Sequence, residues 1–295
     1  MDLDFAVIAV NALTLACIYG TLAIGISITW SSLGLINLAY GFVFAFAGYS
    51  AWLGAEHIHD HAAVVFGAGI LGGALAGIVV CLLAFIPIHD KPGFTMRGMI
   101  ATVAISLVGT QGLLWYFGPR AKALPEVFGY GEWTFGTVVV TYNTAGAIVS
   151  SLLLLAAVLI WMKWSRRGLE IRAMMMNPHA ASLVGIGVRR TGIYVMALTG
   201  GLAGLAAVLL SQTYYVQPFA GFTPMIKGLS IALLGGLGSV PGAVIAAVIL
   251  GFNEAITAAT LGGQYVLMTQ FGLIIALIMI RPRGIAGILD RAREA

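Results

Sequence analysis

Long runs of apolar residues, separated by short polar segments, fill most of the 295-residue chain. A helix needs about 20 apolar residues to cross the hydrocarbon core of a bilayer, and most of these runs approach that length. We therefore predict an all-α, polytopic bundle of about eight or nine transmembrane helices that forms a single domain over residues 1–295. The candidate spans are 5–29, 36–53, 62–86, 99–117, 142–162, 192–214, 224–237, 241–257 and 265–280.

A segment rich in glycine and proline separates two of these spans, 224–237 and 241–257. Glycine and proline at this density do not fit an undisturbed helix. Irregular backbone at membrane depth is tolerated only where protein buries it or where it lines a water-filled cavity. The break therefore marks either a tight contact between helices or part of a translocation pathway, and both alternatives stay open. The pathway candidates in this segment are Gly235, Gly236, Gly238, Ser239 and Pro241.

A second irregular stretch lies early in the chain, where serine, asparagine, tyrosine and glycine gather at 31–41. One interpretation is a polar turn followed by the close packing of small residues. The other is a discontinuous helix that lines a pathway, to which Asn37, Tyr40 and Gly41 would contribute.

The longest polar interruption between spans is the loop 163–191. Asn177 can cap a helix with its side-chain oxygen, and Pro178 fits the first helical position because its missing N–H would be unpaired there. Gly185 can adopt the left-handed conformation that ends a helix. We predict a helix through 169–176, a break, and a two-turn helix over 178–184. The alternative is a loop that is merely well packed.

Composition and charge fix the class of protein and its predicted orientation. The chain is 60% hydrophobic and only 9% charged, which excludes an ordinary soluble domain. If the loop 163–191 is cytoplasmic, only three of the 15 Lys and Arg residues face outside, namely Arg120, Lys122 and Lys227. We therefore predict Asp2 and His59 outside and Glu170 and Arg293 inside.

The chain lacks the residues of several other functional classes. It has no H-E-x-x-H or G-x-S-x-G motif, and the glycines at 93 and 98 are not followed by the lysine of a P-loop, so we expect no enzyme and no bound cofactor. Glu254 is the only acidic residue within a span and has no obvious partner, which argues against a proton-driven pump. A stand-alone channel or a sodium-coupled carrier stays open as the alternative.

Three further features receive ordinary structural explanations. Gly69, Gly73 and Gly77, like Gly200 and Gly204, have the four-residue spacing that lets helices approach closely. The cluster His57, His59 and His61 has the composition of a zinc site, but we interpret it as a polar loop and expect no metal. The basic residues lie at span ends rather than in a patch, so we expect no nucleic-acid partner.

Several motifs together resemble the permease subunits of ATP-binding-cassette importers for branched-chain amino acids, a class that includes urea and amide importers. The matching residues are Ile36 to Gly41 and Ala47 to Tyr49, then Gly168, Arg172, Asn177, Ala181, Leu183 and Gly185, then Leu234 to Ala243, Gly251, Glu254 and Arg281 to Gly284. The chain departs from the family pattern at Tyr40, where histidine or glutamine is usual, and at Phe42, where an acidic residue is common.

The resemblance implies a multi-pass protein of the bacterial inner membrane that transports a branched-chain amino acid or a related small polar solute. It implies a second homologous permease, usually a different chain, two cytoplasmic ATPase subunits that use ATP, and a periplasmic substrate-binding protein. The cytoplasmic loop would then be the coupling helix that sits in a groove of the ATPase. The residues implied in this coupling are Arg172, Asn177, Pro178, His179, Ala181, Leu183 and Gly185.

Overall fold

The computed structural model describes residues 5–129, 131–135, 138–281 and 284–285. Asp2 and Arg293, which we predicted on opposite sides of the membrane, lie outside this range. The elements in chain order are α1 (Phe5–Leu33), α2 (Tyr40–His57), α3 (Ala62–Val80), the π-helical turn η1 (Cys81–Phe85), α4 (Ile86–Ile88), α5 (Phe94–Phe117), β1 (Glu132–Phe135), β2 (Val138–Thr141), α6 (Tyr142–Trp164), α7 (Arg166–Met176), α8 (Pro178–Leu183), α9 (Val188–Ser211), α10 (Phe222–Gly235), α11 (Val240–Thr260), the 3₁₀ turn η2 (Gly263–Tyr265) and α12 (Val266–Ile280).

The predicted helical membrane bundle is confirmed, and each of the nine predicted spans coincides largely with helix. Seven helical segments in the described part of the chain are long and apolar enough to cross a membrane. Two of the predicted spans fall outside that set. Helix α2 has 18 residues but carries Glu56 and His57 at its end, and α10 has only 14 residues.

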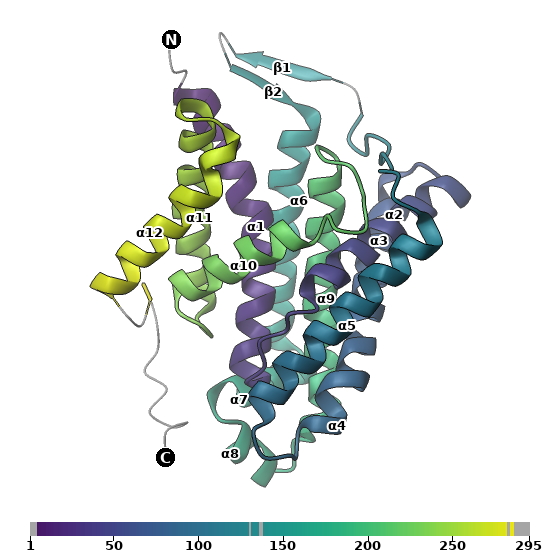
Figure 1. Cartoon of the computed structure of the whole chain (residues 1–295), viewed down its shortest axis with the longest axis vertical. Coiled ribbons are helices and arrows are strands. Elements are labelled where there is room, and N and C mark those ends of the chain that lie inside the picture. The colour runs from purple at the N-terminus through teal and green to yellow at the C-terminus, as the bar shows by residue number, and fades with distance from the viewer. Residues whose placement is uncertain (1–4, 130, 136–137, 282–283, 286–295) are drawn as a thin grey trace.

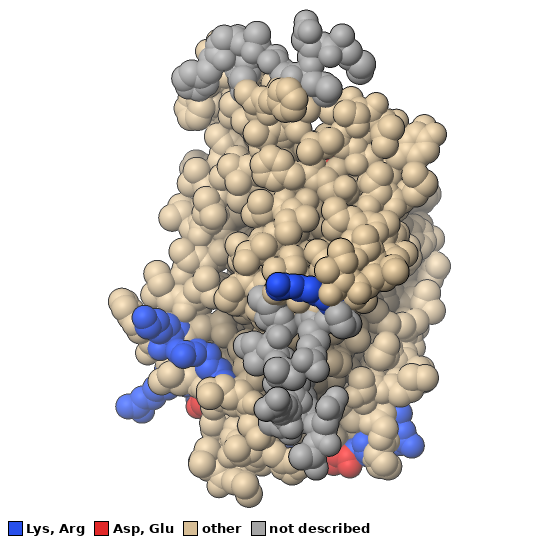
Figure 2. Space-filling model, turned by 90° about the vertical axis from the view of Figure 1, so that its left-hand side faces the viewer, with Lys and Arg blue, Asp and Glu red and all other residues tan. Residues whose placement is uncertain are grey.

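The long helices run roughly along one axis (Figure 1). The hairpin β1–β2 lies at one end of the bundle, and α7 and α8 lie at the other (Figure 1). On the face shown in Figure 2, Lys and Arg are confined to the lower half, towards the end that carries α7 and α8 in Figure 1. The positive-inside rule associates the more basic end with the cytoplasm, and the orientation of the chain stays a prediction.

The centre of the bundle is built from α1 and α9, and α3 packs closely on α9 through glycine faces. A Cβ atom placed on Gly73 would lie 2.2 Å from the carbonyl oxygen of Gly200. A Cβ atom on Gly204 would lie equally close, 2.2 Å, to the carbonyl oxygen of Gly69. The predicted packing role of these glycines is confirmed, because the two helices touch backbone to backbone.

A two-stranded antiparallel sheet between α5 and α6 was not predicted. Its register places Glu132 opposite Thr141 and Trp133 opposite Val140. The second strand is a short run of β-branched residues, Val138 to Thr141, which favour extended backbone. The strands are too short to show alternation in a sequence where apolar runs dominate.

Candidate coupling loop and translocation site

The loop after α6 folds as the cap and stop residues predict. The Asn177 side-chain oxygen accepts hydrogen bonds from the backbone N–H groups of His179 and Ala180, at 3.0 and 3.1 Å. Pro178 occupies the first turn of α8, and Gly185 has a φ of +88°. Helix α8 ends one residue before the predicted end, and α7 begins at Arg166, where Ser165 accepts a hydrogen bond from the N–H of Gly168.

The directions of the side chains on α8 correct one prediction. Ala181, which the resemblance implied in the contact with the ATPase, is only 4% exposed and belongs to the hydrophobic core. Leu183 is 86% exposed, and Arg172 and His179 are also exposed. A helix of six residues is too short to reveal by periodicity which of its sides faces the bundle. The outward surface of α8 is therefore carried by His179 and Leu183, and Ala181 anchors it.

Ion pairs and a ring contact fix this end of the bundle. Arg167 binds both carboxylate oxygens of Glu170, at 3.0 and 3.1 Å, and its guanidinium lies 4.9 Å from the ring centre of Tyr194 on α9. Arg189, at the start of α9, pairs with Asp90 in the turn between α4 and α5. The hydrogen bond from Arg189 lowers the pKa of Asp90 below its usual value. These contacts tie the loop to the helices that cross the membrane.

The break between α10 and α11 is a tight contact between the two helices. A Cβ atom on Gly242 would lie 2.1 Å from the carbonyl oxygen of Gly235. Gly236 and Gly238 have φ values of +95° and +93°, which other residues rarely adopt. Ser239 caps α11 by accepting a hydrogen bond from the N–H of Gly242, at 3.1 Å, and Pro241 lies in the first turn. The contact alternative accounts for these residues, and their role in a pathway stays a prediction.

The early polar stretch is a turn between α1 and α2. The side-chain oxygen of Asn37 accepts a hydrogen bond from the N–H of Ala39, at 3.0 Å. Tyr40 is 1% exposed, and its hydroxyl donates to the carbonyl of Thr199 on α9, at 2.8 Å. A Cβ atom on Gly41 would lie 3.0 Å from the carbonyl oxygen of Gly221. Asn37 and Tyr40 thus hold the protein together at this turn, and their part in transport also stays a prediction.

An ion pair inside the bundle is the largest departure from the sequence-based picture. Lys227, which we placed on the outside, lies on α10 and is 7% exposed. Its ammonium donates to Glu254 on α11, at 2.6 Å, and to the hydroxyl of Tyr19 on α1, at 3.0 Å. Glu254 therefore has the partner that the sequence did not reveal. The sequence did carry one signal for this pair: the basic residue Lys227 and the acidic residue Glu254 lie on the two sides of a break at which the chain reverses its direction.

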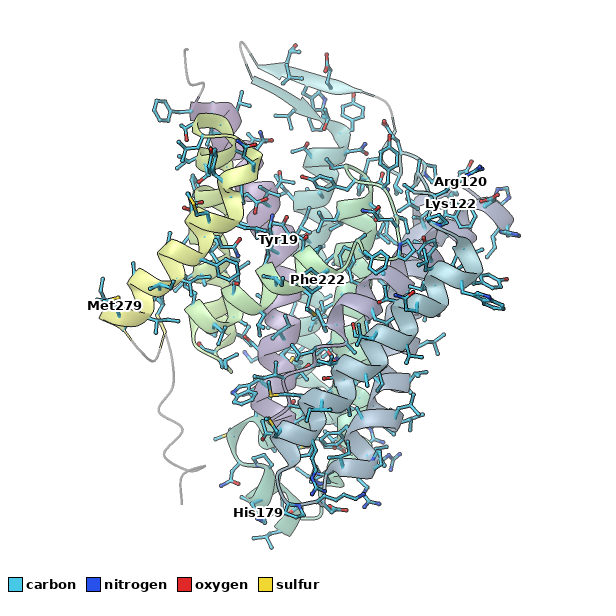
Figure 3. All side chains as sticks on the ribbon, in the orientation of Figure 1. Tyr19, Arg120, Lys122, His179, Phe222 and Met279 are labelled. Carbon is cyan, nitrogen blue, oxygen red and sulfur yellow. The ribbon has the colours of Figure 1, made fainter. Side chains whose placement is uncertain are left out.

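These groups are well separated along the bundle. Figure 3 shows Tyr19 near the middle, next to the start of α10 at Phe222, while His179 lies at the far end from Arg120 and Lys122.

The histidines of 57–61 do not form a ligand set, since no three His, Cys, Asp or Glu side chains in the described residues could hold a metal ion together.

The family model described as "Branched-chain amino acid transport system / permease component" matches residues 8–280. The chain belongs to this family. The high-affinity branched-chain amino acid transport system permease protein BraD of Pseudomonas aeruginosa is 29% identical over 291 residues, with 94% of each chain covered. The corresponding protein LivH of Escherichia coli K12 gives the same identity and the same coverage, 29% and 94%.

Two further similarities widen this comparison. The guanosine ABC transporter permease protein NupP of Bacillus subtilis is 39% identical over 103 residues, which are 33% of this chain and 29% of that protein. The solved structure of PsaBC from Streptococcus pneumoniae in complex with Fab has a TM-score of 0.54 at 13% identity and covers 92% of this chain and 91% of the other. At that identity the likeness concerns the fold alone. The chain is a multi-pass membrane protein with the fold of a transport permease.

Proposed function

We propose that this chain is a permease subunit of an ATP-driven importer and forms, with a second permease, the pathway for branched-chain amino acids or a related small polar solute across the bacterial inner membrane. The observation that carries the proposal is the capped helix α8 at one end of the bundle, where exposed apolar side chains gather: Leu183 lies on α8, Val184 directly follows it, and Met176 is the last residue of α7. Leu183, Val184 and Met176 are 86%, 78% and 83% exposed. Apolar side chains grouped on a surface outside the membrane mark a site for a partner protein.

The partner on this surface would be a cytoplasmic ATPase. The chain has no P-loop of its own, so ATP would be hydrolysed by two partner subunits whose movement reaches the bundle through α8. The contact of Arg167 with Tyr194, in which Glu170 holds the Arg167 guanidinium, joins α7 to α9. A periplasmic binding protein would deliver the solute at the opposite end, where β1 and β2 lie (Figure 1).

The test compares two charged substitutions at exposed apolar residues at the two ends of the bundle. Leu183→Asp alters α8, and Val139→Asp, at a position 47% exposed on β2, is the matched control. Each variant is expressed with its partner permease and the ATPase subunits, and the ATPase that co-purifies is measured. Loss of a central apolar contact costs about 2 kcal/mol or more, which is roughly a 30-fold loss of affinity.

We expect Leu183→Asp to lose the ATPase while Val139→Asp retains it. Equal retention by both variants would show that α8 is not the docking element. Uptake of solute by the chain in liposomes without any ATPase would instead establish a stand-alone carrier.

A further inference from the structure

A cavity of about 380 Å³ lies beside the buried ion pair. It is lined by α1, α2, the end of α9, the start of α10 and the segment that joins α9 to α10, and the ammonium-bearing side chain of Lys227 forms part of its wall. Its volume falls in the range of small-molecule sites, which is roughly 300–1,000 Å³. The cavity therefore has both the room for a small solute and a charged group to contact it.

The ammonium of Lys227 has capacity for one further hydrogen bond. It carries three N–H donors. Glu254 and the Tyr19 hydroxyl accept two of them, and no other acceptor for this group is found in the described part of the chain. The side chain is only 9% exposed, so a donor left without a partner is unfavourable there. An anionic oxygen in the cavity would satisfy it.

Glu254 supports Lys227 from outside the cavity. Its carboxylate binds the ammonium at 2.6 Å but does not contribute to the cavity wall. The carboxylate fixes the position of the Lys227 ammonium and compensates its burial, because a buried ammonium without an anionic partner is costly. Tyr19 adds a second restraint, since the ammonium also lies 4.8 Å from the centre of its ring.

The rest of the cavity wall is largely aromatic and aliphatic. Phe44 from α2, Leu210 from α9, and Tyr214 and Phe219 from the connecting segment line it. Such a wall suits the apolar body of a ligand, while a small number of polar groups fixes its orientation. The connecting segment is held in place by paired backbone hydrogen bonds between Lys122 and Val216, each 2.8 Å.

We propose that this cavity is a solute site of the permease itself and that it takes a small molecule with a carboxylate and an apolar side chain. The third N–H of Lys227 binds the carboxylate, the aromatic wall holds the side chain, and Glu254 positions Lys227. The assignment deepens the proposed transport function and rests on it. It favours amino acids over nucleosides, because nucleosides carry no carboxylate.

The experiment measures binding of radiolabelled L-leucine to the purified permease–ATPase complex in nanodiscs, without binding protein. Three competitors separate the groups of the ligand: 4-methylpentanoate has the carboxylate and no amine, 3-methylbutylamine has the amine and no carboxylate, and guanosine has neither. We expect leucine to bind and only 4-methylpentanoate to displace it. Displacement by the amine or by guanosine, or no binding of leucine, would overturn the proposal.

A double variant keeps the test independent of folding. Lys227→Gln alone would leave Glu254 buried and unpaired, whereas Lys227→Gln combined with Glu254→Gln removes both charges. We expect the double variant to assemble with the ATPase and to bind leucine roughly 10- to 100-fold more weakly, as loss of a hydrogen bond from a charged group implies. Unchanged leucine affinity in the assembled double variant would mean that the ion pair is only structural.

A matched control is Thr257→Val with Thr269→Val, which removes a partly buried polar contact on α11, a 3.0 Å hydrogen bond to α12. It should leave leucine affinity unchanged; an equal loss there would also refute the assignment. Co-purification of the ATPase from the same preparations reports on the proposed function separately. A complex that assembles and transports, but binds no leucine on its own, would end this inference and leave the transport function intact.

Discussion

The contact between α3 and α9 predicts a clear effect of adding a single methyl group. In Gly73→Ala the new Cβ would lie 2.2 Å from the carbonyl oxygen of Gly200 and 3.0 Å from the N–H nitrogen of Gly204. Both neighbours are backbone atoms, so no side chain can turn away. Restoring a normal contact requires the helices to separate by on the order of 1 Å along this face, which weakens the dispersion contacts around it.

The magnitude follows from two opposing terms. Overpacking of a well-packed interface costs about 1–3 kcal/mol, and replacing glycine by alanine inside a helix favours folding by about 1 kcal/mol. The net expectation is a destabilisation of up to about 2 kcal/mol. Gly67→Ala is the matched control, because it lies on the same helix and a Cβ there has nothing within 4 Å. Only the helix-propensity gain applies to it.

The assay is reversible unfolding of the two variants and the wild type in mixed detergent micelles, followed by circular dichroism. We expect Gly73→Ala to unfold at a lower denaturant fraction than the wild type and Gly67→Ala at an equal or higher one. If the two variants were equally stable, the backbone contact between α3 and α9 would not be what limits the distance between them.

Three further predictions concern α8, the break and the orientation. Asn177→Ala removes two hydrogen bonds that the Asn177 side chain accepts, so we expect a loss of about 1 kcal/mol of local stability. This loss should appear as roughly 5-fold faster hydrogen exchange at the start of α8, and the control Ser182→Ala, which leaves the cap in place, should not show it. Gly238→Leu forces a side chain into a left-handed backbone next to Ser31, so uptake should fall although the ATPase still co-purifies, and normal uptake would show that the break is only a turn. In a chain without its two cysteines, His59→Cys should react with an impermeant thiol reagent from outside and Glu170→Cys should not, and the reverse labelling would invert the topology.

Local signals in the sequence were sufficient to predict the helices and the fold of the loop 163–191. The apolar runs set the helices because backbone groups in lipid must be satisfied within the segment. The cap at Asn177 and the stop at Gly185 act through atoms a few residues away, so their residue types alone carried the prediction. The spacing of Gly69, Gly73 and Gly77 likewise indicates that one face of a helix has no side chains and can pack closely against a neighbour.

Contacts between distant segments could not be predicted in the same way. The pairing of Lys227 with Glu254 depends on how α10 and α11 close against each other, which the contact of Gly235 with Gly242 decides. Charge counting placed Lys227 outside because it treats each basic residue near a span end as solvated. The inward direction of the Ala181 side chain could not be predicted for a different reason, because a helix of six residues is too short to show periodicity.

The same hairpin of α10 and α11 connects the proposed solute site with the break at 235–242. At one point along the hairpin, Lys227 joins Glu254 and bonds to Tyr19 of α1. At the closed end of the hairpin, Gly238 lies against Ser31 of α1. A Cβ atom on Gly238 would lie 3.2 Å from the Cβ of Ser31. The Gly235–Gly242 contact and the ion pair both hold α10 against α11, so the two helices pack as a unit against α1. A solute that changes the position of Lys227 would therefore act on the whole hairpin, including the break, rather than on α10 alone.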